Sequence, residues 1–373
     1  MSEIYMAGPD ISKEDEEIVL DALRHGWYGS RAYEYVEKFE LEFAKYHNRK
    51  YGLMTTNCTS AIHLALLSIN LDKSSEVIVP DCTWIGSASP INYVGAKTIF
   101  ADIDKDNWCI SPDSIKMNIN DNTKAIVTVN LYGNMPNYEE IEKICESKSI
   151  FLLEDAAESL GSKYNKKRSG SFGDFSFFSF HRSKTITTGE GGMLLTDNDE
   201  LYDRCKFLRD HGRNPGSYYN TEIAYKYMPF NLQAALGYSQ FKKIDKLVER
   251  KREIWSQYKT SLKELPDLHF NIEPNNVFNS VWSTTCVFGD SYSFTNDEII
   301  KKLNKVNLPA RPFFYPLSSL PAYNEESKYK NKNINSYTIS KKGINLPSAL
   351  NITNDQIKYY CNSLIEMIKK NEK

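Results

Sequence analysis

The 373-residue chain lacks paired cysteines and clustered histidines. Its seven cysteines are widely spaced and form no C-x-x-C motif, which disfavours a disulfide framework and a structural zinc site. The six histidines are scattered, without an H-x-x-x-H pair, so we expect no metal site. Free cysteines of this kind are typical of a reducing compartment, and we expect a cytoplasmic protein.

An excess of positive charge and long apolar runs are also absent. The 46 Lys and Arg residues nearly balance the 48 Asp and Glu residues, giving a net charge of -2. No global field therefore attracts nucleic acid or an anionic membrane, and any anion site must be local. No apolar run approaches the roughly 20 residues that span a bilayer, and MSEIYMAGPD lacks the apolar core of a signal peptide. We expect neither nucleic acid nor membrane as a partner.

Short apolar runs alternate with helical patterns through the first two-thirds of the chain. Helical spacing at 60–69 and 137–148 separates near-continuous apolar strands, a pattern typical of a mainly parallel sheet covered on both faces. The predicted strands span residues 76–80, 97–103, 124–133, 150–157, 175–180 and 192–197. In such an α/β fold, ligands bind at the carboxyl ends of the strands.

The pattern changes near Gly237, and a chain of this length exceeds one typical domain. Residues 240–265 form a charged amphipathic pattern without Gly or Pro, which predicts one long helix connecting two domains. The chain ends in another helical pattern, TNDQIKYYCNSLIEMIKK. We therefore predict a large domain over 1–243 and a smaller α+β domain over 244–373, which begins with the connecting helix.

Two segments near strand ends suit a phosphate and a planar ring. In TTNCTSAIHLAL, small polar residues at 55–60 run into a helix, whose free N–H groups and the hydroxyl of Thr59 or Ser60 would bind a phosphate. The alternative is a plain helix N-cap. In PDCTWIGSASP, Trp84 follows the strand at 76–80 and would lie flat against a planar ring. The alternative is a core tryptophan.

Two further segments supply charge. In LLEDAAES, Asp155 ends an apolar strand, where a buried carboxylate needs a partner such as the protonated ring nitrogen of pyridoxal 5'-phosphate (PLP). Alternatively, Glu154 and Asp155 provide a helix N-terminal charge or a structural ion pair. In FSFHRSKTITTGEGGML, Lys184 would form a Schiff base if it is desolvated, with the hydroxyls of Ser179 and Ser183 near a phosphate. The alternative is a solvated loop lysine.

Taken in chain order, TTNCTSAIHLA, VPDCTW, LLEDAAESLG, GSFGDFSFFSFHRSKTITTGEGGMLLTD and NLQAALG resemble the DegT/DnrJ/EryC1/StrS aminotransferases. The resemblance covers nearly the whole chain. It implies the aspartate-aminotransferase fold (PLP fold type I), with a large domain whose mainly parallel sheet lies between helices and a smaller α+β C-terminal domain. It also implies a transaminase that uses PLP, with pyridoxamine 5'-phosphate (PMP) as intermediate. RPFFYPLSSLPAY at 311–323 looks most like the perosamine synthase branch, which aminates GDP-4-keto-6-deoxymannose.

The resemblance assigns the reacting part of the site residue by residue. Lys184 would be the catalytic lysine, which binds the cofactor covalently and carries a proton. Asp155 would pair with the pyridinium nitrogen, and Trp84 would stack on the ring. Glu158 would lie near the cofactor O3', at a position where the family often has Gln.

The resemblance also implies how the cofactor phosphate is held. Cys58, Thr59 and Ser179 would bind it, the first through its backbone N–H. Relatives are homodimers with shared active sites, in which the partner chain contributes an Asn in an N-Y-R-M pattern. The corresponding stretch reads AYKYMPFN here, so Lys226 would take that role as a point charge, with Asn231 as a weaker substitute.

The acceptor is assigned by weaker resemblance. Trp27, Arg311 and Tyr315 resemble residues that face a sugar nucleotide, while the aromatic run at 313–315 has domain-edge packing as its alternative. Arg213, in RDHGRNPG, would bind a phosphate of the acceptor. The implied reaction moves an amino group from glutamate to a GDP-4-keto-6-deoxymannose-like sugar for a surface polysaccharide such as capsule or lipopolysaccharide. A small phosphorylated ketone such as dihydroxyacetone phosphate is the alternative acceptor.

Position 184 bears on the type of reaction. In the related 3-dehydratase branch, a His replaces the PLP lysine, whereas this chain has Lys184 and its nearest His at 181. The resemblance therefore favours amino transfer over a PLP-dependent sugar dehydration, which would release ammonia and need no amino donor.

Overall fold

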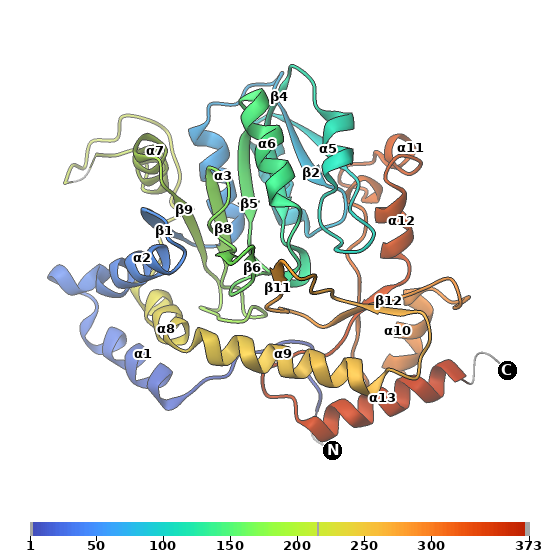
Figure 1. Ribbon diagram of the computed structural model, residues 1–373. Helices are drawn as coiled ribbons and strands as arrows, with labels where there is room; N and C mark the ends of the chain where they lie inside the picture. Colours follow the sequence, from blue (N-terminus) through green and yellow to red (C-terminus); the bar gives the residue numbers. More distant parts are fainter. Residues whose placement is uncertain (1–2, 215, 370–373) are drawn as a thin grey trace.

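The computed structural model describes residues 3–214 and 216–369 (Figure 1). Its centre is a seven-stranded sheet with the strand order β1-β9-β8-β5-β4-β2-β3. These strands span β1 Tyr51–Thr55, β2 Glu76–Pro80, β3 Lys97–Ala101, β4 Thr123–Val129, β5 Phe151–Asp155, β8 Phe175–Ser179 and β9 Gly192–Thr196. Strand β9 is antiparallel to β1 and β8, and the other neighbouring pairs are parallel. The predicted mainly parallel sheet is therefore present.

Both faces of this sheet are buried, as the near-continuous apolar strands predict. Side chains alternate between faces along a strand, so Val77 and Val79 join the core around helix α3 (Cys58–Ser68), while Ile78 joins the core around α6 (Tyr138–Lys148). Helix α3 is buried along most of its length, and its sequence is apolar on all sides. This burial fixes the start of α3 at the carboxyl edge of the sheet.

Further helices surround the sheet and continue the chain beyond it. The α-helices are α1 Lys13–His25, α2 Glu34–Tyr46, α4 Ser89–Tyr93, α5 Pro112–Asn118, α7 Asp199–Arg209, α8 Asn231–Lys242, α9 Ile244–Ser261, α10 Asn296–Asn304, α11 Glu326–Tyr329, α12 Ile334–Ser340 and α13 Asn354–Lys369. Short 3-10 turns lie at Gly29–Tyr33, Ile85–Ser87, Leu131–Gly133 and Leu317–Ser319.

A second sheet lies in the C-terminal part, with the order β10-β12-β14-β13. Its strands span β10 Leu268–Phe270, β12 Thr285–Phe288, β13 Arg311–Pro312 and β14 Gly343–Asn345. Figure 1 shows α9 running beneath the large sheet with α13 beside it, and these two helices are in contact. The N-terminal segment also joins this part, because Ile4 lies in its core and Met6 O accepts a hydrogen bond from Ser348 N at 2.9 Å.

A small third sheet connects the two parts of the chain. Strand β11 (Val277–Phe278), from the C-terminal part, pairs antiparallel with β6 (Lys163–Tyr164), which pairs with β7 (Lys167–Arg168). The loop between β11 and β12 therefore passes close to the end of the large sheet.

Two elements differ from the sequence-based expectation. Strand β1 was not predicted, although it is almost fully buried. The helix predicted over 240–265 is two helices, because the chain breaks at Lys243 (φ -109°, ψ 19°) and α9 ends at Ser261. The break has a tertiary cause, since α8 packs against α1 and α2 whereas α9 packs against α13. The predicted C-terminal helix corresponds to α13, and its last predicted residue, Lys370, lies outside the described residues.

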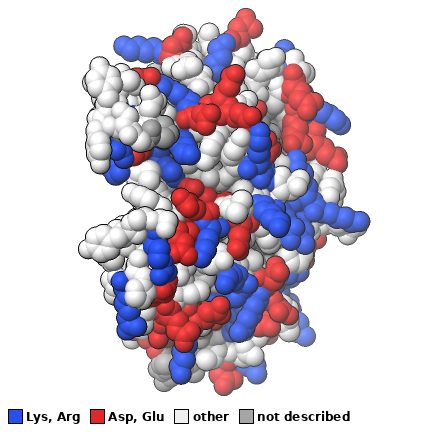
Figure 2. Space-filling view, turned by 90° about the vertical axis from the view of Figure 1, so that its left-hand side faces the viewer, with Lys and Arg blue, Asp and Glu red and all other residues white. Residues whose placement is uncertain are grey.

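The surface is consistent with the balanced charge. Figure 2 shows one face on which basic and acidic side chains are interspersed rather than gathered into a single-sign stripe. In the part of the chain that the structure describes, no helix is both long and apolar enough to cross a membrane.

Candidate active site

A cavity of about 820 Å³ opens at the carboxyl ends of the parallel strands, the edge where ligands were expected. Its walls come from the start of α3 and from the segments that follow β2, β4, β5 and β8. The C-terminal part of the chain contributes Trp282 and the segment around β13. The predicted site residues that line this cavity are Cys58, Thr59, Trp84, Asp155, Glu158, Ser179, Lys184, Arg311 and Tyr315.

Lys184 is held at a defined point in this cavity. Its side chain is only 13% exposed, and Nζ lies 3.1 Å from Oε1 of Glu158 and 3.9 Å from the centroid of the Trp282 ring. Its backbone N–H donates to the carbonyl of His181 at 2.9 Å, which closes the turn after β8. The alternative of a solvated loop lysine is therefore wrong.

The two neighbouring acids at the end of β5 have different surroundings. Asp155 lines the cavity, and its carboxylate accepts hydrogen bonds from Ser87 Oγ at 2.6 Å and Ala157 N at 3.0 Å. Glu154 is satisfied on the protein side by Asn130 Nδ2, Gly170 N, Phe172 N and Ser176 Oγ. Neither acid forms an ion pair within the described residues, and β5 leads into a turn, so both structural alternatives are wrong.

The carboxylates of the cavity are desolvated. Burial raises the pKa of Asp155 above its ordinary value, and the hydrogen bonds from Ser87 and Ala157 together with the charge of Lys184 oppose this shift. Burial also raises the pKa of Glu158, opposed mainly by Lys184. A cationic group placed beside Asp155 would stabilise its charged form.

The first turn of α3 offers N–H groups to an anion. Asn57 caps the helix, and its Oδ1 accepts hydrogen bonds from Ser60 N at 2.8 Å and Ser60 Oγ at 2.9 Å. The alternative of a plain helix N-cap is therefore confirmed for Asn57 and Ser60. The N–H groups of Cys58 and Thr59 have no intrahelical acceptor by position. Gly192 allows strand β9 to approach the start of α3 closely, because a Cβ on it would lie 2.6 Å from Cys58 N. Burial raises the pKa of the Cys58 thiol well above its usual range, so its backbone is the relevant group.

Trp84 presents a bare ring to the cavity. It is 63% exposed, so the core alternative is wrong, and its ring centroid lies 6.3 Å from that of Phe314. A Cβ on Gly86 would come within 2.9 Å of Trp84 Cδ1, which explains a glycine at this place. At the end of β8, Ser179 Oγ accepts from the backbone N–H of His181 at 3.3 Å.

The C-terminal segment RPFFY forms the mouth of the cavity. Phe313 is fully buried, so domain-edge packing describes this residue, whereas Tyr315 is 48% exposed. Arg311 is exposed and has no acidic partner among the described residues. The stretch that follows this segment is tied to the residue after β2, because the carboxylate of Asp81 accepts from Ser318 N and Ser318 Oγ, both at 2.8 Å.

Three predicted site residues lie outside this cavity in the chain. Lys226 Nζ is 2.8 Å from Oδ1 of Asp210, and Arg213 pairs with Oδ2 of the same carboxylate at 2.6 Å. Trp27 is 48% exposed, and its Nε1 donates to a backbone oxygen of α1. The segment that contains Arg213 also includes Pro215, which lies outside the described residues.

The structure adds residues that the sequence did not single out. Ser87 bonds Asp155, Trp282 lies against Lys184, and Tyr132 donates its backbone N–H to Oε2 of Glu158 at 3.0 Å. Ser87 lies within the quoted segment PDCTWIGSASP, so its position after β2 was the available signal. Trp282 comes from a distant loop, and no local pattern connects it with the lysine.

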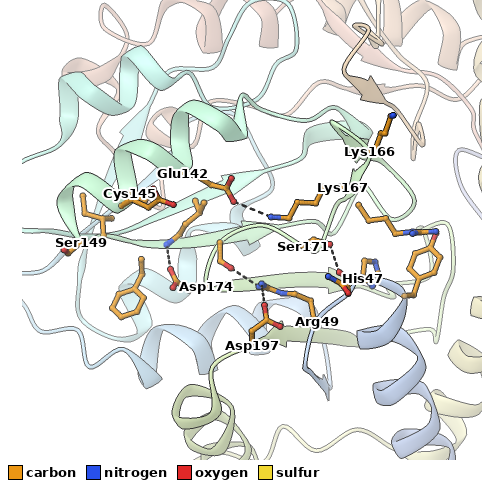
Figure 3. Close-up of a pocket in the computed structure, with 18 residues that line it drawn as sticks. His47, Arg49, Glu142, Cys145, Ser149, Lys166, Lys167, Ser171, Asp174 and Asp197 are labelled. Carbon is orange, nitrogen blue, oxygen red and sulfur yellow. Dashed lines mark hydrogen bonds and ion pairs between the residues drawn. The ribbon is translucent and has the colours of Figure 1, made fainter.

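A second cavity, of about 890 Å³, lies at the opposite edge of the sheet, at the amino ends of β5 and β8. Several of its charges are satisfied within the protein (Figure 3): Arg49 pairs with Asp197 at 2.8 Å, Lys167 with Glu142 at 3.6 Å, and the carboxylate of Asp174 accepts a backbone N–H at 2.8 Å. None of the predicted site residues lines it. We therefore take the cavity at the carboxyl edge as the candidate active site.

Comparisons with known proteins show what the whole chain is similar to. The DegT/DnrJ/EryC1/StrS aminotransferase family profile matches residues 9–365. GDP-perosamine synthase of Escherichia coli O157:H7 is 37% identical over 98% of this chain and 99% of its own, and that of Vibrio cholerae is 35% identical over 95% and 96%. The Streptococcus pneumoniae protein Spr1654, solved in PLP and PMP forms, superposes with a TM-score of 0.91 at 25% identity over 99% of this chain. In its PLP form, 99% of that chain is covered.

Proposed function

Because the chain belongs to the DegT/DnrJ/EryC1/StrS aminotransferase family, we propose that it uses PLP to transfer an amino group from glutamate to the keto group of a nucleotide-linked deoxysugar resembling GDP-4-keto-6-deoxymannose. The observation that carries this proposal is the convergence of Lys184, Asp155 and Trp84 on one cavity. The perosamine synthases, similar over nearly their whole length, support the choice of acceptor.

The residues of the cavity fit PLP in charge and shape. Asp155 is a buried carboxylate with only neutral hydrogen-bond donors, which suits a protonated ring nitrogen. The bare face of Trp84 suits the ring, and the N–H groups of Cys58 and Thr59 with the hydroxyl of Ser179 suit the phosphate. When bound, PLP takes up the amino group as PMP and withdraws electrons from the reacting carbon.

Lys184 has two tasks in this proposal. Its amine attaches the cofactor covalently, and when it is free, Nζ takes a proton from the reacting carbon and delivers one to the carbon that receives hydrogen. The low exposure of its side chain excludes water from this transfer. Glu158, 3.1 Å away, orients Nζ and stabilises its ammonium form.

The mouth of the cavity favours an extended anionic acceptor over a small ketone. Arg311 carries a charge that no described carboxylate neutralises, and Tyr315 exposes a ring beside it, which suits a nucleotide diphosphate. A triose phosphate would occupy only a small part of about 820 Å³. Dehydration is disfavoured because position 184 is lysine, which amino transfer requires.

The proposed assembly is a cytoplasmic homodimer with shared active sites, serving the synthesis of a surface polysaccharide such as capsule or lipopolysaccharide. Its support is a set of exposed apolar side chains, comprising Tyr218, Tyr219, Ile223 and Phe230, which are near Lys226 in the sequence, together with Trp27 and Tyr28. Burying such side chains against a second copy is favourable. In the dimer, Lys226 would reach the partner's cofactor phosphate, while Trp27 and Arg213 would approach the acceptor.

The division into domains at residues 243 and 244 belongs to the same proposal. The break between α8 and α9 and the separate C-terminal sheet support it. The N-terminal segment is the exception, because Ile4 packs in the core of the C-terminal part.

The test is a direct assay of PLP-loaded protein with glutamate and one acceptor at a time. We expect GDP-4-keto-6-deoxymannose to give an aminated sugar and one 2-oxoglutarate per product, with little turnover of dihydroxyacetone phosphate. Turnover of dihydroxyacetone phosphate alone would overturn the proposal that the acceptor is a nucleotide-linked sugar. Release of ammonia without 2-oxoglutarate would instead assign a dehydratase.

A further inference from the structure

Trp282 reaches the active site from the C-terminal part of the chain. It lies in the loop between β11 and β12 and lines the cavity, yet no role follows for it from the reaction as described. Within the described residues, its ring is the aromatic face that lies over the ammonium of Lys184, at 3.9 Å from Nζ to the ring centroid. A distance this short is typical of a cation–π contact.

Trp282 makes a second contact with the same segment. Its indole Nε1–H donates to the backbone carbonyl of Ser183, the residue before Lys184, at 2.8 Å. The ring therefore touches the end of the lysine side chain, and its N–H fixes the backbone from which that side chain starts. These two contacts constrain Lys184 at both ends.

The loop that carries Trp282 is held in a costly conformation. Val281 has a φ of 51°, a left-handed conformation that is rare for a β-branched residue. It is maintained by a hydrogen bond from Val281 N to Asn279 Oδ1 at 2.8 Å, while Asn279 Nδ2 donates to Asn134 Oδ1 at 2.6 Å. Strain of this kind persists where the surrounding structure enforces it, and it is concentrated at functional sites.

A second residue with a positive φ acts on Glu158, the carboxylate that pairs with the lysine. Tyr132 has a φ of 55°, and its backbone N–H donates to Glu158, which pairs with Lys184. The ring of Tyr132 is nearly parallel to those of Trp282 and Phe314, with interplanar angles of 10° and 3°. The aromatic stack thus links the ring over Lys184 to the mouth of the cavity.

We infer that Trp282 is a positioning residue for Lys184: its ring and its N–H hold the lysine side chain between the indole face and Glu158 whenever Nζ is not bonded to the cofactor. The inference rests on the proposed function. It predicts that the capture of PLP by Lys184 in the apoprotein depends on Trp282. In that capture the ammonium loses one proton, and Nζ forms a C=N bond with the aldehyde carbon of free PLP as one water leaves.

The test compares Trp282→Leu and Trp282→Phe with wild type. Apoprotein is mixed with PLP from pH 6 to 10, and the growth of the cofactor absorbance band is followed. We expect the Leu variant to capture PLP about 10-fold to 100-fold more slowly at every pH, as misplacement of a reacting group by about 1 Å causes. The Phe variant keeps a ring but loses the hydrogen bond, so we expect a fall of about threefold. In steady state, kcat falls in the same order and the KM values stay unchanged.

The matched control is Phe278→Leu. This ring comes from the same part of the chain and lies 4.2 Å from the guanidinium carbon of Arg252, outside the active-site cavity. We expect it to capture PLP at the wild-type rate. Affinity for PMP, which forms no bond with Lys184, should be the same in all variants, because the cofactor contacts remain.

The outcomes separate this inference from the proposed function. Three results in the Leu variant would overturn the positioning role while the aminotransferase assignment stands. These are a wild-type rate of PLP capture, a capture rate that is only shifted along the pH axis without a fall in its maximum, and a loss of PMP affinity as large as the loss of capture rate. If wild type itself forms no band with PLP, the proposed function fails and the inference fails with it. Should the Leu variant not fold, the Phe variant decides by the same measurements.

Discussion

The two cavities at opposite edges of the large sheet are similar in size but differ in how their charges are satisfied. At the amino edge, Arg49 and Lys167 each face a carboxylate of the protein (Figure 3). At the carboxyl edge, Lys184 pairs with Glu158, but Asp155 accepts only neutral hydrogen bonds and Arg311 has no described acidic partner. The cavity at the amino edge is slightly larger, at about 890 Å³ compared with about 820 Å³.

Volume alone therefore does not distinguish the functional cavity from the other one. A charge that pairs with an opposite charge of the protein needs no ligand to satisfy it. Charges without a protein partner are costly to bury, and they remain where a ligand completes them. Substitutions matched between the two cavities can therefore test the assignment.

The largest effect is expected from Lys184→Ala. The variant has no amine to bind PLP or to carry the proton, so turnover and the covalent cofactor band should both disappear, as measured by 2-oxoglutarate formation and absorbance. Its control is Lys166→Ala in the amino-edge cavity, which should retain both. An active Lys184→Ala variant would contradict the assignment of the site.

The next largest effect is expected from Asp155→Asn. The amide preserves the shape but cannot hold the ring nitrogen protonated, so we expect kcat to fall about 100-fold, equivalent to about 2.7 kcal/mol. Asp174→Asn makes the same change in the amino-edge cavity, where the side chain accepts a backbone N–H from Leu152, and should leave kcat unchanged. Equal losses of kcat in the two variants would mean that Asp155 and Asp174 affect kcat only through the stability of the fold.

A smaller effect is expected at the mouth of the site. Arg311→Gln removes the unpaired charge, so the KM for the nucleotide-sugar acceptor should rise about 10-fold, the effect of losing one charge-assisted contact. The KM for glutamate should change less. The control Arg168→Gln removes a guanidinium that lies 4.1 Å from the Tyr46 ring centroid in the other cavity. An unchanged acceptor KM in Arg311→Gln would exclude this residue from acceptor binding.

The smallest effect concerns Lys251 in α9, a lysine buried near the site whose Nζ donates to the carbonyl of Ser348 at 2.6 Å. Burial lowers its pKa from 10.5 to about 7. The unfolded chain therefore binds more protons between these values, and the contribution of Lys251 to stability rises with pH from about 7 to about 10. In Lys251→Met this contribution is absent. Urea unfolding at several pH values should show that the free energy of unfolding rises less steeply with pH in the variant than in wild type. Identical slopes in the two proteins would refute the lowered pKa of Lys251.

Much of the fold could be predicted from local patterns. Buried parallel strands are apolar along their whole length, so β2 was predicted with its observed ends and β5 and β8 within two residues. Strand β1 was missed because YGLMT is short and contains a glycine, which packs closely against a backbone oxygen of α2. The break at Lys243 has no local signal, since only the packing of α8 and α9 on different partners requires it.

The site was predictable where a motif carries the chemistry. Lys184, Asp155 and Trp84 lie in segments that resemble a family, and all three meet in one cavity. Trp282 could not be found in this way, because its contact with Lys184 depends on the strained turn at Val281 and on the position of a distant loop. The roles of Lys226 and Arg213 involve a second copy of the chain, so they stay predictions.

In the proposed enzyme, one lysine at the carboxyl edge of the sheet holds the cofactor. The most direct measurement is borohydride reduction of the PLP-loaded protein, followed by digestion and mass spectrometry. Reduction fixes PLP on the lysine that bears it, and we predict modification of Lys184 alone. Modification of Lys251, of a lysine in the amino-edge cavity such as Lys166, or of none would contradict the account.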